Sequence, residues 1–264
     1  MSVVQAVLLG ILQGISEFIP ISSSGHLVVA RHLMGLGEIP ILFDVILHIA
    51  TLIVIVFVFR ERIGRMLVSL LRWAMRRSDE SDATDLRLAL LVIIATALTA
   101  VIGLVIAELD LARYPRLVAL LFIVTGVVLF VSRYLHGRLG YDQLGTRHAV
   151  ITGIAQGLAV LPGISRSGIT ITAALASGID RSRAGEFSFL ISVPAVLGAL
   201  VLTLRDLSDL TTAVSAAAMA AGFGASLLVG FVSLLLLLRL IKGGKLYLFS
   251  FYLIPLGVLG LILL

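Results

Sequence analysis

Polar and charged side chains gather in two short stretches of an otherwise apolar chain. Glu17 comes just before "PISSSGHL", residues 20–27, and Arg166 lies between two serines in "PGISRSGIT", residues 162–170. Hydroxyls, the backbone N–H groups of helix starts and a guanidinium are the groups that hold phosphate oxygens. Ser23 and His26 are three residues apart, so on a helix they share a face and can exchange a proton. These residue types indicate chemistry on a phosphate group.

A second pair of residues could supply oxygen ligands to a metal ion. Gln13 and Glu17 are four residues apart and share one face of a predicted helix. Amide and carboxylate oxygens are ligands that a hard divalent cation prefers. Two protein oxygens do not complete such a site, so water and a substrate phosphate would have to provide the rest.

The elements that position these residues lie in a membrane. Of the 264 residues, 59% are hydrophobic and 13% are charged, about half the charged share of a soluble domain, and the mean hydropathy is +1.15. There is no cysteine, which excludes disulfides and thiolate metal sites. Apolar runs long enough to span a bilayer predict six transmembrane helices. They cover about 41–60, 86–107, 116–135, 184–205, 214–240 and 246–264.

Two apolar segments do not fit the pattern of spans. Residues 1–35 and 149–178 are interrupted by Gly, Pro and Ser, which predicts helical hairpins that enter the bilayer and turn back. "GILQGISEFIPISSSG" (10–25) and "GIAQGLAVLPGISRSG" (153–168) align without a gap and match at eight of sixteen positions. Three spans separate the copies, so they should enter from opposite sides as an inverted-topology repeat. We therefore predict an all-α integral membrane protein with six transmembrane helices and two re-entrant hairpins.

The repeat also predicts the domain organisation and the place of the site. Residues 1–264 should form one membrane domain, with repeat halves of about 1–140 and 145–264. Fifteen Lys or Arg residues fall on one side of the predicted topology and four on the other, which makes the basic side cytoplasmic. The net charge of +5 is then explained by the Lys and Arg residues that fix the orientation in the membrane. Binding of nucleic acid is excluded as the reason for this charge. The hairpin tips should meet near the midplane, where Glu17, His26 and Arg166 would share a polar cavity.

Each of these residues also has a purely structural interpretation. A serine after a proline caps helices, a lone histidine can be a packing residue, and Glu17 with Arg166 can form an ion pair. Their joint occurrence on two related tips favours a functional site. For Asp44, His48 and Glu186, near the ends of spans, helix capping or pairing at interfaces is the preferred interpretation.

At this point the sequence resembles a known family. "QGISE" followed by "PISSSGH", then "PGISRSG" in the second half, is similar to the undecaprenyl-diphosphate phosphatases of bacteria, the bacitracin-resistance type. The resemblance covers the whole chain. It implies hydrolysis of undecaprenyl diphosphate to undecaprenyl phosphate and inorganic phosphate, which recycles the lipid carrier of cell-wall synthesis. It also implies a divalent cation, Mg²⁺ or Ca²⁺, and a bacterial plasma membrane with the site open toward the outer face.

The resemblance assigns roles residue by residue. Gln13 and Glu17 occupy the metal-associated positions, although the first is Gln rather than Glu, which removes one anionic ligand. Ser23, His26, Glu17 and Arg166 are the expected catalytic residues. The expected phosphate-binding residues are Ser22, Ser24, Gly163, Ser165, Arg166, Ser167, Gly168 and Thr170.

Several alternatives stay open at this stage. Either Ser23 attacks with His26 as proton acceptor, or His26 itself attacks and forms a phosphohistidine. The alternative function is a secondary transporter or flippase of a lipid phosphate or another anion, because inverted repeats with broken helices are typical of transporters. Membrane lipid is an expected partner, and the Ala/Gly/Ser-rich run 211–226 is compatible with a homodimer.

Overall fold

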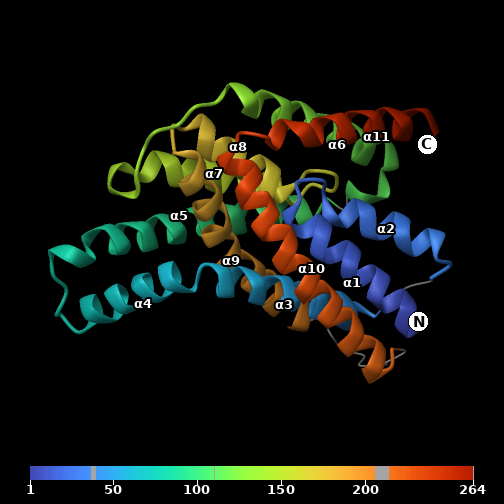
Figure 1. Ribbon diagram of the computed structural model, residues 1–264, viewed down its shortest axis with the longest axis horizontal. Helices are drawn as coiled ribbons and strands as arrows, with labels where there is room; N and C mark the ends of the chain where they lie inside the picture. The colour runs from blue at the N-terminus through green and yellow to red at the C-terminus, as the bar shows by residue number, and fades with distance from the viewer. Residues whose placement is uncertain (37–39, 110, 206–213, 264) are drawn as a thin grey trace.

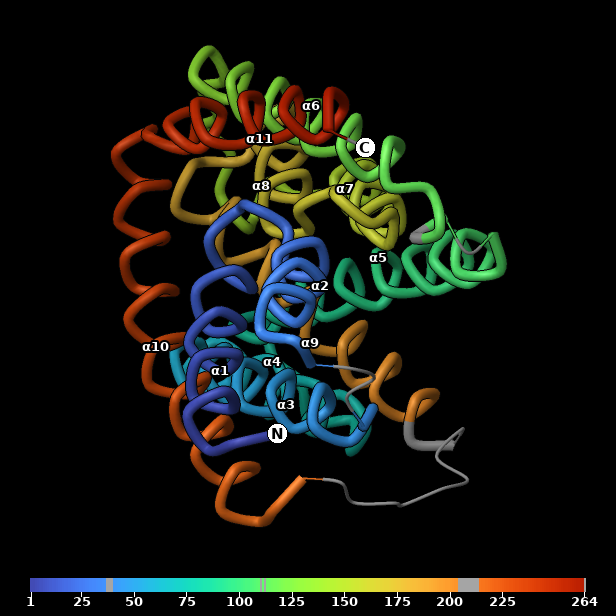
Figure 2. Tube along the Cα trace, turned by 90° about the vertical axis from the view of Figure 1, so that its right-hand side faces the viewer, coloured from blue at the N-terminus to red at the C-terminus, as the bar shows by residue number. Residues whose placement is uncertain are grey.

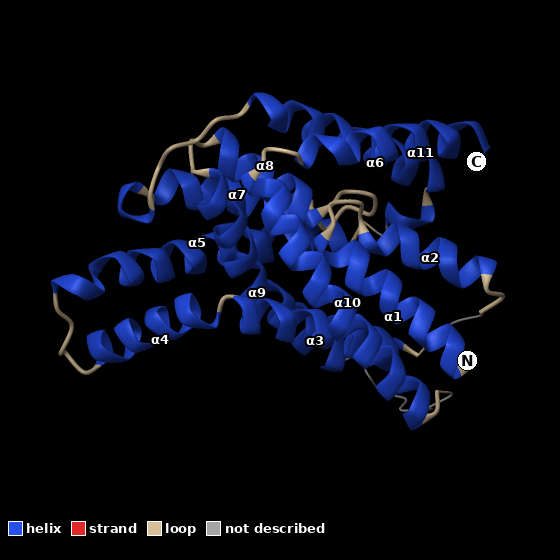
Figure 3. Cartoon of the chain, in the orientation of Figure 1, coloured by secondary structure: helices blue, strands red, loops and turns tan. Residues whose placement is uncertain are grey.

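The protein is helical throughout the part that the structure describes. This computed structural model describes residues 1–36, 40–109, 111–205 and 214–263, which form α-helices and short 3₁₀ turns with no strand (Figure 3). The helices are α1 (Val3–Phe18), α2 (Ser23–Leu33), α3 (Ile41–Val58), α4 (Arg60–Ala74), α5 (Ala83–Ala107), α6 (Pro115–Val131), α7 (Thr146–Leu158), α8 (Arg166–Ala176), α9 (Arg181–Arg205), α10 (Ala216–Lys242) and α11 (Ser250–Leu263).

Among the residues that the structure describes, six helical stretches are long and apolar enough to cross a bilayer. They are 41–58, 80–107, 115–134, 181–203, 216–242 and 246–263, each within a few residues of a predicted span except at the start of the second, which begins six residues earlier. Many large apolar side chains on them face outward, for example Leu228, Val232 and Ile262. Exposure of this kind suits a lipid environment. The prediction of a multi-pass, all-α membrane protein is confirmed.

Both interrupted segments form a pair of short helices with a break where the sequence predicts it. Pro20 follows the first break, and Ile19 before it has extended backbone at φ −60° and ψ 129°, so α1 ends at Phe18. In the second segment Gly163 has φ +97°, a conformation that favours glycine, and separates α7 from α8. The direction in which each pair enters a membrane, and thus the inverted topology, stays a prediction.

Glycines related by the repeat let each hairpin pack closely on a long helix. A Cβ on Gly10 would lie 2.3 Å from the carbonyl oxygen of Gly222, so α1 touches the backbone of α10. Gly153, its counterpart in the second copy, would place a Cβ 2.8 Å from the backbone of Ala95 in α5. Each hairpin therefore packs on a long helix from the other half of the chain. Figure 1 shows α1 along α10 and α7 beside α5.

The remaining helices close the assembly around these contacts. α6 and α11 lie side by side along one face, as Figure 2 shows from the end of the molecule.

At the end predicted to be cytoplasmic, Arg62 of α4 donates to Glu186 of α9 at 2.8 Å and to Asp85 of α5 at 3.1 Å. The expected interface pairing of Glu186 is confirmed. This ion-pair network joins α4, α5 and α9.

Candidate active site

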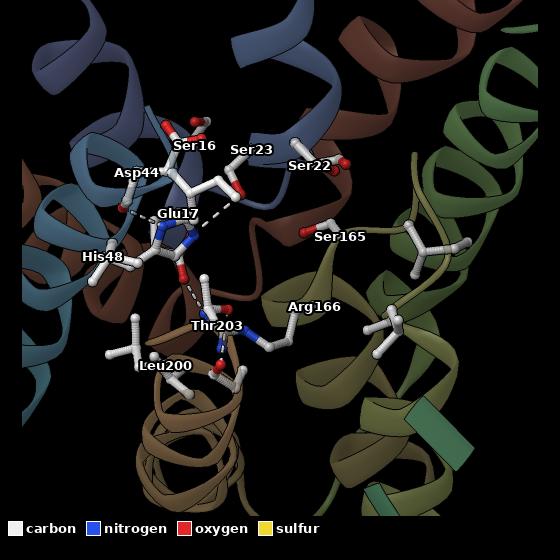
Figure 4. A pocket seen from close by; sticks show the side chains of 18 residues that line it. Ser16, Glu17, Ser22, Ser23, Asp44, His48, Ser165, Arg166, Leu200 and Thr203 are labelled. Atoms are coloured by element: carbon white, nitrogen blue, oxygen red, sulfur yellow. Dashed lines mark hydrogen bonds and ion pairs between the residues drawn. The ribbon is translucent and has the colours of Figure 1, made fainter. Parts of the chain in front are cut away.

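A cavity of about 470 Å³ lies where the two hairpin tips meet (Figure 4). The α1–α2 tip, the α7–α8 tip, α3 and α9 line it. Its polar lining residues are Ser16, Glu17, Ser22, Ser23, Ser24, Asp44, His48, Ser165, Arg166 and Thr203. Val196, Ala199 and Leu200 of α9 add an apolar wall. A polar floor beside an apolar wall suits a ligand with a charged head and a hydrocarbon tail.

Glu17 is at the centre of the polar groups, and its side chain is only 5% exposed. Its Oε1 accepts a hydrogen bond from the Arg166 guanidinium, which forms an ion pair with it. Its Oε2 accepts from Gln13 Nε2 at 3.1 Å and from Ser23 Oγ at 3.2 Å. Because burying a carboxylate is costly, these donors are what allow it to remain charged there.

The two tips also touch through backbone and small side chains. Ser167 Oγ donates to the carbonyl oxygen of Phe18 at 2.9 Å. A Cβ on Gly168 would lie 3.2 Å from Cβ of Pro20, so the start of α8 lies directly on the break after α1. The two stretches that carry the chemistry are 143 positions apart and meet, as the sequence predicts.

Of the described helices that begin at the cavity, α2 and α8 each have a serine directly before the first turn. Ser165 caps α8, and its hydroxyl accepts from the Gly168 N–H at 3.2 Å. Ser22 precedes α2 at φ +71°, a conformation that non-glycine residues rarely adopt, and its buried Oγ has no partner among the described residues. Helix starts present free N–H groups and a positive dipole end, which suit an anion.

Apart from His26, the predicted site residues fall into two groups, those that line the cavity and those that do not. Glu17, Ser22, Ser23, Ser24, Ser165 and Arg166 line the cavity. Gln13, Gly163, Ser167, Gly168 and Thr170 are not among the lining residues: Thr170, for example, is fully buried and donates to the Arg166 carbonyl at 2.7 Å. We therefore interpret Thr170 as a group that orients the first turn of α8.

The ring of His26 is turned away from this cavity. Its Nδ1 lies 2.9 Å from the Ser22 carbonyl oxygen, and its Nε2 lies 2.7 Å from the hydroxyl of Tyr252 in α11. The ring also stacks on Tyr252 with centroids 5.7 Å apart. Helical spacing places His26 near Ser23, but these contacts hold its ring elsewhere, so the expected hydrogen bond between the two side chains is absent from the described site.

Asp44 and His48, for which the sequence favours helix capping or interface pairing, also line the cavity. Asp44 forms an ion pair with Arg31 that joins α3 to α2, so interface pairing is confirmed for it. His48, one turn later, points its Nε2 toward Glu17 Oε2 at 3.9 Å. The spacing of four between Asp44 and His48, inside an apolar span, was the signal that could have identified them.

Comparison with known proteins gives a consistent result. A profile of the family described as "Bacitracin resistance protein BacA" matches residues 6–259. The protein named undecaprenyl-diphosphatase of Treponema denticola is 45% identical over 98% of this chain and 96% of its own length. Proteins of the same name from Desulfosudis oleivorans and Methanosphaera stadtmanae are 41% and 37% identical, and each alignment covers at least 97% of both chains.

Proposed function

Because the chain belongs to the bacitracin resistance protein BacA family, we propose that it hydrolyses undecaprenyl diphosphate to undecaprenyl phosphate and inorganic phosphate. The proposal rests on relatives that are named for this activity and that align with nearly the whole chain. The reaction recycles the lipid carrier of cell-wall synthesis, and the family name implies resistance to bacitracin. The cavity has the amphiphilic lining that a prenyl diphosphate requires.

The diphosphate is held by the two helix starts and one guanidinium. Arg166 lies in the first turn of α8, so its charge and the N–H groups of that turn act on the same phosphoryl group. Ser22 supplies a buried hydroxyl that has no partner in the described part of the chain and is available to a phosphate oxygen. These donors are fixed before the substrate arrives, which is how a site stabilises charge that develops as a bond breaks.

Ser23 is the nucleophile that the geometry favours. Its hydroxyl already donates to Glu17 at 3.2 Å, so the carboxylate can take the proton as the serine oxygen bonds to the terminal phosphorus. The bond from that phosphorus to the bridging oxygen then breaks, and undecaprenyl phosphate leaves. Water hydrolyses the phosphoserine and releases inorganic phosphate. The alternative of attack by His26 requires its ring to leave Ser22 and Tyr252.

A divalent cation is part of this proposal, and two neighbouring side chains offer it oxygen ligands. Gln13 Oε1 is buried without a partner among the described residues, and it lies beside the carboxylate of Glu17. Gln13 and Glu17 would hold the cation, which, when bound, neutralises diphosphate charge. Within this site Arg166 holds the other carboxylate oxygen in place.

The location and assembly of the protein follow from the same reasoning. We place it in the bacterial plasma membrane with the cavity open toward the outer face, because the loops rich in Lys and Arg belong in the cytoplasm. A homodimer is compatible with the exposed apolar faces of the six long helices.

The test is release of inorganic phosphate from a prenyl diphosphate by the purified protein. Wild-type protein should release phosphate, and Glu17→Ala and Arg166→Ala should each lower kcat/KM by at least about 100-fold. Arg116→Ala is the matched control, because this arginine is exposed at the first turn of α6. Absence of release by wild type at any concentration of divalent cation would reject the hydrolase and favour transport of a lipid phosphate.

A further inference from the structure

We infer that His48 is a nitrogen ligand of the divalent cation at Glu17, so that this chain binds a transition metal more tightly than Mg²⁺ or Ca²⁺. The inference deepens the proposed function by naming the class of cation. The role of the metal site rests on the proposed hydrolysis, but metal binding can be measured whether or not the protein hydrolyses a diphosphate.

The hydrogen bond at the far side of the ring defines which nitrogen of His48 is free. Nδ1 lies 2.9 Å from the carbonyl oxygen of Asp44, and a carbonyl only accepts, so Nδ1 carries the proton. Nε2 of the neutral ring then presents a lone pair. Metal-binding histidines characteristically donate their second ring N–H to a carbonyl or carboxylate in this way, which fixes the tautomer and the ring plane.

The carboxylate oxygen of Glu17 that is not paired to Arg166 lies near this nitrogen. Nε2 of His48 and Oε2 of Glu17 are 3.9 Å apart, too far for a hydrogen bond. Zinc bonds of about 2.0–2.1 Å to nitrogen and 2.0–2.2 Å to oxygen span this separation only at a wide angle at the ion, and a tetrahedral angle requires the two atoms to lie about 3.4 Å apart. The side chains of His48 and Glu17 must therefore approach each other by about 0.5 Å when one ion binds both. The His48 side chain is 36% exposed to the cavity, so an ion and a substrate phosphate can reach it (Figure 4).

Gln13 supplies a third donor. Its amide nitrogen now donates to Glu17 Oε2, and its buried oxygen has no partner among the described residues. A half-turn of the amide exchanges the two atoms and directs the oxygen at an ion bound to Oε2. The set is then one carboxylate, one amide oxygen and one imidazole, with water or substrate phosphate completing it.

This ligand set predicts the class of cation. Mg²⁺ and Ca²⁺ favour several carboxylates and other oxygens, whereas imidazole suits zinc, nickel and related ions. Glu17 is the one carboxylate of this ligand set, and its other oxygen is already paired to Arg166, so the set has little charge to attract a hard cation. The nitrogen of His48 therefore contributes a large share of the affinity, and affinities should rise from Mn²⁺ toward Co²⁺ and Zn²⁺.

The experiment measures binding of Co²⁺ and Mg²⁺ to the purified full-length protein, in detergent and without a polyhistidine tag. Wild type should bind Co²⁺ at least about 100-fold more tightly than Mg²⁺, and His48→Gln should weaken Co²⁺ binding by about tenfold or more. His136→Gln is the matched control, because the ring of His136 also lies 2.9 Å from a carbonyl, that of Tyr134, on the exposed surface. It should bind Co²⁺ as wild type does.

A second measurement uses only the wild-type protein, so it does not depend on whether the His48→Gln variant folds. The Co²⁺ protein should show one strongly shifted, exchangeable N–H proton resonance from the ring of His48, and Zn²⁺ should abolish it by displacing Co²⁺. Equal Co²⁺ affinity in wild type and His48→Gln, or no such resonance, would overturn the assignment. Tight Co²⁺ binding by a protein that releases no phosphate would reject the hydrolase and retain the metal site.

Discussion

Substitution of Gly10 by alanine tests whether close packing of α1 on α10 positions the site. The added Cβ would lie 2.3 Å from the carbonyl oxygen of Gly222, and ordinary contact begins at 3.4 Å. α1 must therefore move away from α10 by about 1 Å, because the obstacle is backbone and cannot rotate aside. Glu17 lies two turns farther along the same helix and moves with it.

The size of the expected effect follows from this displacement. Overpacking should lower the free energy of unfolding by about 1–3 kcal/mol. A shift of about 1 Å in a group that holds the reacting atoms can cost about 100-fold in rate. We expect Gly10→Ala to lower kcat/KM for phosphate release by roughly that factor and to lower the midpoint of thermal unfolding.

A glycine on the partner helix provides the control. A Cβ on Gly224 of α10 would meet nothing within 4 Å, so Gly224→Ala should retain activity and gain about 1 kcal/mol in helix stability. Both variants are measured for phosphate release and thermal unfolding in the same detergent. If Gly10→Ala is as active and as stable as Gly224→Ala, the reasoning from α1–α10 packing is refuted.

Three further predictions concern the ion pair at the tips, the nucleophile and the network at the other end. Arg166→Ala should unfold at a lower temperature than the double variant with Glu17→Gln, because only the single variant leaves a buried carboxylate unpaired; equal midpoints in thermal scans would contradict this. Quenching in denaturing detergent at neutral pH, which preserves both phosphoserine and phosphohistidine, should trap labelled phosphate on Ser23 in wild type and none in Ser23→Ala, and label on a histidine would reject Ser23 as nucleophile. Arg62→Met should lower the free energy of unfolding by about 3 kcal/mol and leave KM unchanged, because Glu186 and Asp85 lose this guanidinium and none of the three residues lines the cavity; a changed KM would show that the network reaches the site.

The sequence determined the elements of this fold because their causes are local. Apolar runs of sufficient length predicted the six long helices, and Pro20 and Gly163 predicted the breaks that end α1 and separate α7 from α8. The gapless repeat, together with the cost of burying charge in an apolar segment, predicted that Glu17 and Arg166 meet.

Tertiary structure alone decided which neighbours each side chain has. Helical spacing placed His26 near Ser23, yet the ring lies against Tyr252, a residue of α11 that no local pattern connects to it. His48 came to Glu17 because α3 packs beside the α1–α2 tip, and the 3.9 Å between them depends on how two helices cross. Spacing along one helix fixes which residues share a face, but the direction of that face is set by packing between helices distant in sequence.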